Sequence, residues 1–139
     1  SFINKEVIPR NWEVLSSRFD TTKFTVFAQR MKIIGEILEF YEAIADYRQT
    51  RSQHSFAIAL DELADICIAS CTLIRLQDRK YLQKTVPLRS SEEEWIRLVI
   101  NRRIDVLLSM VLEYAGMFSV DIRQIILRKI EYNMIRTDL

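Results

Sequence analysis

The chain has 139 residues, with 20 basic and 19 acidic side chains and a formal net charge of +1. This balance excludes the strongly basic surface on which nucleic-acid binding or docking on an acidic membrane depends, so we expect neither partner. Only two glycines and two prolines occur, too few for the many turns of a strand-rich fold, which predicts one all-α domain over residues 1–139.

The first two helices are predicted from a breaker and from apolar periodicity. Residues 1–9 are expected to be irregular as far as Pro9, and a short helix follows over residues 11–18. A second helix is predicted over residues 22–48, where apolar residues repeat at steps of three and four. The repeat forms a seam of Phe24, Phe27, Met31, Ile34, Leu38, Tyr41 and Ala45. A second stripe of Ile33, Ile37, Phe40 and Ile44 widens the apolar face of this helix.

The third predicted helix covers residues 55–76, after a polar break at residues 48–55. It is apolar on nearly all sides, which is typical of a helix buried in a core. Three acids near its middle argue against a membrane span: Asp61, Glu62 and Asp65. Cys67 and Cys71 lie one turn apart within it, and we interpret them as reduced core residues of a cytoplasmic protein without a leader segment.

The last third of the chain holds the longest connection and two further helices. Residues 77–90 are polar and are predicted to form the connection. Two serines followed by three glutamates, residues 90–94, predict the start of a fourth helix that reaches Ala115 and ends at Gly116. A fifth helix is predicted over residues 120–135. Together these elements predict a four- to five-helix bundle.

Four carboxylates define a candidate metal site. No Lys or Arg occurs in residues 52–74, so the acids of the third helix lack a local basic partner, and an unpaired buried carboxylate is costly or stays protonated. Glu62 and Asp65 are three residues apart and project the same way, as do Glu36 and Glu39 on the second helix. Because a short link makes the two helices antiparallel neighbours, we expect all four around one pocket. An all-oxygen set suits Mg²⁺, with Mn²⁺ as the alternative.

Two segments that carry these acids, GEILEFYEAI (residues 35–44) and DELADICI (residues 61–68), resemble the MazG-like all-α nucleoside triphosphate pyrophosphatases. That superfamily includes the dimeric dUTPases and dCTP pyrophosphatases. Its motif is E-E-x-x-E followed by E-x-x-D, and Gly35 stands where the family has its first glutamate, which leaves the number of metal ions open. A third segment, KIEYNMIRTD (residues 129–138), is similar to the family ending K-x-x-x-N-x-x-R. Residues 77–105 depart from the short family members and are expected to form an insertion.

The resemblance implies Mg²⁺-dependent hydrolysis of an NTP or dNTP to the NMP or dNMP and pyrophosphate, a reaction of nucleotide-pool house-cleaning. It assigns the four carboxylates to the metal, and Glu36 or Glu39 to orientation of the attacking water. Lys129, Asn133 and Arg136 share one helical face, where two cations and an amide suit a phosphate group. The resemblance also implies a homodimer or homotetramer with a pocket completed across the subunit interface.

The aromatic residues supply candidates for stacking on the base. Trp12, Phe40 and Trp95 are the candidates, although each fits a core position as well. His54, the single histidine, lies in the polar break and is given no role.

Simpler interpretations of these patterns stay open. Each acidic pair also fits a solvated helix face, and this alternative is stronger for the pair on the second helix. The chain could then be a non-catalytic helical interaction module, in which ion pairs from Arg102, Arg103 or Arg128 fill the acidic pocket and leave no cavity. It could also be a nucleotide-binding regulator that has kept the site and lost turnover.

Overall fold

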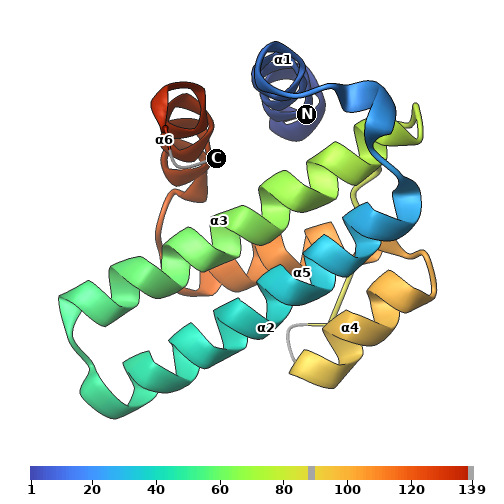
Figure 1. Ribbon diagram of the computed structural model, residues 1–139. Helices are drawn as coiled ribbons and strands as arrows, with labels where there is room; N and C mark the ends of the chain where they lie inside the picture. The colour runs from blue at the N-terminus through green and yellow to red at the C-terminus, as the bar shows by residue number, and fades with distance from the viewer. Residues whose placement is uncertain (88–89, 138–139) are drawn as a thin grey trace.

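The computed structural model describes residues 1–87 and 90–137, and within them it contains helices and connecting turns but no strands (Figure 1). The all-α prediction is therefore confirmed, with six α-helices in place of the four to five expected. The elements are a π-helical segment (Ile3–Val7), α1 (Ile8–Arg18), a 3-10 turn (Thr21–Lys23), α2 (Val26–Thr50), α3 (Gln53–Leu76), α4 (Glu92–Ile100), α5 (Ile104–Met117) and α6 (Ile122–Ile135).

Helices α2 and α3 form a long antiparallel hairpin on which the other helices pack (Figure 1). The link between them is only two residues, not the eight of the predicted polar break. Arg51 adopts the left-handed conformation with φ of 54°, and Ser52 caps α3 by accepting a hydrogen bond from the Ser55 N–H at 3.0 Å. This tight turn fixes the register of the two helices, and with it the position of the acids that they carry.

The core-facing side of α2 is the second apolar stripe, not the longer seam. Ile33, Ile37, Phe40 and Ile44 are all buried. The middle of the seam faces outward, with exposed fractions of 70% for Phe27, 51% for Met31 and 47% for Leu38. The periodicity therefore predicted an amphipathic helix correctly, but it did not show which of the two apolar stripes is buried, because only packing distinguishes them.

The predicted fourth helix is two helices, because the chain reverses at residues 101–103. Arg102 is left-handed with φ of 61°, and its N–H donates to the Val99 carbonyl while the Arg103 N–H donates to the Leu98 carbonyl. These two bonds form a Schellman motif, which normally carries glycine at the left-handed position. The reversal lets both α4 and α5 pack on the hairpin, α4 against α2 and α5 against α3.

The N-terminal segment is helical, which corrects the expectation that residues 1–9 are irregular. Pro9 lies in the first turn of α1, directly after the π-helical segment, in which the Ile8 N–H donates to the Ile3 carbonyl. Helix α1 lies beside α6, and both pack on α3 (Figure 1). Arg18 joins the two, donating from Nη1 to the Met134 carbonyl and from Nη2 to the Arg136 carbonyl, each at 2.6 Å.

The connection after α3 and the helix α4 make up most of residues 77–105, the segment expected as an insertion. Tyr81 is buried, and its backbone N–H and carbonyl bond the side chain of Asn4 at 2.8 Å each. Trp95 is fully buried and stacks on Phe40, with ring centroids 5.6 Å apart. Among the described residues, no helix combines the length and the apolar character needed to cross a membrane.

Candidate metal and phosphate site

The hairpin brings the predicted acids together. Glu36 on α2 and Glu62 and Asp65 on α3 each offer a carboxylate oxygen, and the three oxygens all lie within 4.8 Å of one another. Glu39 is more exposed and lies at the edge of this group, and its proximity contributes to raising the pKa of both Glu36 and Glu62. The four acids therefore form one cluster across the two helices, with three of them at the spacing that a single cation needs.

The cluster is electrostatically strained without a cation. Burial, followed by the charges of Asp65 and Glu39, raises the pKa of Glu36 to about 7. Burial and the charge of Asp65 likewise raise the pKa of Glu62 to about 7. One oxygen of each, Oε2, is buried and has no hydrogen-bond partner among the described residues. Carboxylates crowded in this way either keep a proton near neutral pH or are neutralised by a cation.

One basic side chain reaches the cluster from a distant part of the chain. Lys129 on α6 places its Nζ 3.0 Å from Oδ1 of Asp65, and both side chains are about three-quarters buried. Burial raises the pKa of Asp65, and Lys129 opposes this shift. The sequence assigned Lys129 to phosphate, so its pairing with an acid of the cluster is a contact that sequence reasoning missed.

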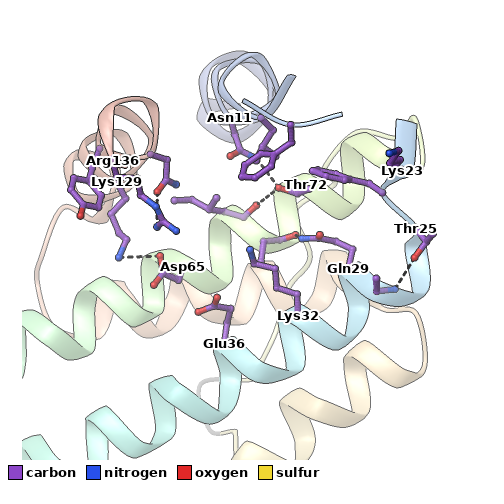
Figure 2. A pocket seen from close by; sticks show the side chains of 18 residues that line it. Asn11, Lys23, Thr25, Gln29, Lys32, Glu36, Asp65, Thr72, Lys129 and Arg136 are labelled. Carbon is purple, nitrogen blue, oxygen red and sulfur yellow. Dashed lines mark hydrogen bonds and ion pairs between the residues drawn. The ribbon is translucent and has the colours of Figure 1, made fainter. Parts of the chain in front are cut away.

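A cavity of about 500 Å³ opens beside the cluster, between α1, α2, α3 and α6 (Figure 2). It is lined by two of the acids, Glu36 and Asp65, and by all three predicted phosphate ligands: Lys129, Asn133 and Arg136. Figure 2 shows Lys129, on α6, and Arg136, which directly follows α6, on the side of the cavity opposite the hairpin, with Lys129 reaching Asp65. Two groups of residues that are far apart in the sequence thus face the same space.

Further cations in this cavity were not identified from the sequence. Lys23, at the end of the 3-10 turn, and Lys32, one turn before Glu36 on α2, both line the cavity. The i to i+4 spacing of Lys32 and Glu36 was the available signal, because it places both on one side of the helix. The cavity therefore carries acids at one end and several cations on its walls, which suits a metal–polyphosphate ligand.

The other two acids face a second, more open hollow. Glu39 and Glu62 line a depression of about 510 Å³ together with Glu42 and Asp46. The cluster therefore forms a wall between two hollows, and only one of them has cations among its lining residues.

The candidate base-stacking residues lie elsewhere. Phe40 and Trp95 are 1% and 0% exposed and have no surface to offer a base. Trp12 is partly buried on α1, under the guanidinium of Arg75 at 4.7 Å, and meets the ring of Phe24 edge-on at 6.3 Å. None of the three candidates lines the cavity, whereas Phe24 does.

The ion pairs expected of a purely structural acidic patch do not form in the described residues. Arg102 and Arg103 lie at the reversal between α4 and α5, and Arg128 is exposed on α6. None of the three pairs with the cluster in the part of the chain that the structure describes. An open cavity and the Lys129–Asp65 pair are found instead.

Comparisons of the chain with protein-family models, with curated proteins and with solved structures gave no match. By its fold and its site, the protein is an all-α bundle with one cavity. The cluster of acids lies on one side of this cavity, and Lys129 and Arg136, the basic wall, lie on another.

Proposed function

We propose that this chain is a Mg²⁺-dependent nucleoside triphosphate pyrophosphohydrolase. One observation carries the proposal: the acids Glu36 and Asp65 and the predicted phosphate ligands Lys129, Asn133 and Arg136 line the same cavity. An acidic patch on a protein surface has no need of phosphate ligands beside it. A metal-dependent reaction on a polyphosphate requires both metal-binding acids and phosphate-binding residues around one cavity.

The donor set fits Mg²⁺ or Mn²⁺. All ligand atoms are carboxylate oxygens, and two of them are buried without a hydrogen-bond partner among the described residues. Glu36, Glu62 and Asp65 would hold the ion, with Glu39 at the edge of the cluster. Such an ion supplies charge that offsets the negative charge developing on the leaving pyrophosphate.

In the proposed reaction, water attacks the α-phosphorus, the α–β anhydride bond breaks, and pyrophosphate leaves. Glu36 or Glu39 orients the water and accepts its proton, a role that a carboxylate beside the reacting phosphate can fill. Lys129 leaves Asp65 and turns to a phosphate oxygen as the substrate binds. Asn133, whose Oδ1 accepts a 3.2 Å bond from Nη1 of Arg136, holds that guanidinium toward the cavity.

The test is release of pyrophosphate from a panel of NTPs and dNTPs with Mg²⁺. Glu62→Gln should remove most of the activity and weaken Mg²⁺ binding measured by calorimetry. Asp61→Asn is the matched control, because Asp61 is exposed on the same helix and lies outside the cluster. The proposal fails if no nucleotide yields pyrophosphate and Glu62→Gln binds Mg²⁺ as tightly as the parent.

A nucleotide-binding regulator without turnover is the second candidate, favoured by the Lys129–Asp65 ion pair. A lysine that stays on Asp65 neutralises part of the cluster without a metal. This candidate predicts nucleotide binding that is independent of Mg²⁺ and releases no pyrophosphate. Calorimetry with and without Mg²⁺, run beside the activity assay, separates the two.

We also propose that the chain forms a homodimer through the outward face of α2. Phe27, Met31 and Leu38 are exposed there. Gly35 lies in the same row, and a Cβ at this position would meet no atom within 4 Å. A glycine inside a helix costs about 1 kcal/mol relative to alanine, and close approach of a second helix is a reason to keep one.

The charges on α2 favour a second copy as the occupant of this face. The first half of the helix carries Arg30, while Lys32 faces the cavity, and the second half carries Glu42 and Asp46 ahead of Arg48 in the last turn. Antiparallel pairing of two α2 helices therefore sets basic halves against acidic halves. Sedimentation velocity should give a dimer for the parent and a monomer for Leu38→Lys. A parent that stays monomeric over the whole concentration range overturns this proposal.

A further inference from the structure

Two carboxamide side chains form part of the cavity lining beyond the acid cluster. Asn11 on α1 and Gln29 on α2 both line the cavity, and both are more than nine-tenths buried, with exposed fractions of 3% and 9%. Figure 2 shows Asn11 reaching down from α1 and Gln29 lying near the hairpin. Neither residue belongs to the metal cluster or to the basic wall.

The amide nitrogens of both side chains are tied to α3. Nδ2 of Asn11 donates to Oγ1 of Thr72 at 2.8 Å, and Nε2 of Gln29 donates to the carbonyl of Ala69 at 3.0 Å. The Thr72 hydroxyl donates its hydrogen to the Ile68 carbonyl at 3.0 Å, so it can only accept a hydrogen bond from Asn11. These partners fix which end of each amide faces α3.

The carbonyl oxygens are therefore the ends left for a ligand. Among the described residues, no donor bonds Oδ1 of Asn11 or Oε1 of Gln29, and neither oxygen is sealed away from the cavity. Each nitrogen also keeps one further N–H. The cavity thus offers two acceptors, each with a donor beside it.

The position of these groups along α3 matches the length of a nucleotide. Ala69 and Thr72 follow Asp65 by four and seven residues, so the three lie on one face of the helix, about 6 Å and 10.5 Å apart along its axis. These spans are comparable to the separation of the α-phosphate and the base in a nucleotide. The apolar residues Leu15, Phe24 and Ile68 also line the cavity and suit a flat ring.

We infer that Asn11 and Gln29 select a nucleobase that carries an exocyclic amino group beside a ring-nitrogen acceptor, which means adenine or cytosine. Such an edge gives two N–H donors to the carbonyl oxygens and accepts one amide N–H. Uracil and thymine offer a single N–H on this edge, so one of the two buried amide oxygens would be left without a donor. The inference rests on the proposed function for the placement of the phosphates.

The test uses binding, so that it does not depend on turnover. Calorimetry with α,β-imido dCTP and α,β-imido dUTP in the presence of Mg²⁺ compares two ligands that differ only at the base edge. We expect the cytosine analogue to bind at least about tenfold more tightly. Selective binding of the cytosine analogue, with no pyrophosphate released from any NTP or dNTP, would contradict the proposed function and still support this inference. Equal affinities, tighter binding of dUTP, or no binding of either overturn it.

A substitution on α3 tests the role of the fixed amide. Thr72→Val removes the hydroxyl that orients Asn11 at almost constant volume, and the preference for the cytosine analogue should fall to less than about threefold. Ser70→Ala is the control, since Ser70 is buried on the same helix and does not line the cavity. If Thr72→Val melts like the parent and keeps full selectivity, Asn11 does not contact the base. If Thr72→Val unfolds, the inference is decided by the affinities of the parent protein for the two analogues.

Discussion

Single side chains in the acid cluster link the charge state of the protein to its stability. The pKa of Glu36 is raised from 4.5 to about 7 in the folded chain, chiefly by burial and then by Asp65 and Glu39. Between these two pH values the folded state holds a proton that the unfolded state has released. Stability contributed by this group is therefore complete below about pH 4.5 and is lost as the pH rises through about 7.

Mg²⁺ should reverse this loss. In metal-free buffer we expect Glu36→Gln to raise the melting temperature at about pH 8 by about 2–5 °C and to change it little at about pH 5. Added Mg²⁺ should stabilise the parent more at the higher pH, because protons no longer compete for the carboxylates. Differential scanning fluorimetry at both pH values measures this, and a Mg²⁺ effect that is larger at the acidic pH contradicts a carboxylate site.

Lys129 should have opposite effects on the metal and on the nucleotide. It neutralises Asp65 in the free protein, so Lys129→Met should tighten binding of Mg²⁺ alone by about tenfold, because a competing cation is removed. The same change should weaken binding of a nonhydrolysable triphosphate, since one phosphate contact is lost. Arg128→Met, an exposed neighbour on α6, should alter neither. Weaker binding of both ligands would mean that Lys129 only supports the fold.

At the level of secondary-structure elements, the left-handed positions in the turns are occupied by residues other than glycine. In the part of the chain that the structure describes, four positions other than glycine have positive φ: Arg51, Asp78, Arg102 and Ser119. Both glycines, Gly35 and Gly116, lie inside helices. The low glycine count predicted few turns and long helices, and this failed at residues 101–103 because an arginine occupies the position where glycine marks a helix end.

Relieving one of these turns should stabilise the protein. Arg102→Gly removes the steric cost of a left-handed side chain in the Schellman motif, and we expect the free energy of unfolding to rise by about 0.5–1 kcal/mol. Gln124→Gly, an exposed position inside α6, should lower it by about 1 kcal/mol. Urea denaturation followed by circular dichroism gives both values. A loss of stability in Arg102→Gly would show that the arginine side chain makes a contact that outweighs the strain.

The whole molecule is organised around the α2–α3 hairpin. Contacts within the hairpin could be predicted from the sequence, whereas contacts between the hairpin and the other helices could not. Carboxylate spacing and the antiparallel link correctly predicted that Glu36, Glu62 and Asp65 would meet. The burial of Phe40 and Trp95, the outward direction of the seam and the approach of Lys129 depend on how distant helices pack. Periodicity identifies the faces of a helix, but it carries no information about which neighbour covers each face.

The packing of α1 on α6 should control the order of the basic wall. Arg18 bonds two carbonyls at the end of α6, including that of Arg136. We expect Arg18→Met to speed hydrogen exchange in the last turn of α6 and to weaken triphosphate binding several-fold, while Mg²⁺ binding is unchanged. Arg10→Met, which removes only an exposed 4.0 Å pair with Glu6, is the control. Unchanged exchange in α6 would show that other contacts hold this helix end.

The cavity takes its walls from both ends of the described chain, and this has a consequence for folding during synthesis. The hairpin with its acids leaves the ribosome before α6 is made, so the nascent acids first meet one another without Lys129. Contacts between residues as far apart as Asp65 and Lys129 close late, because the intervening loop must be ordered first. The cavity is therefore the last part of the described structure to mature, and the nascent acids are exposed to divalent cations before their own lysine is made.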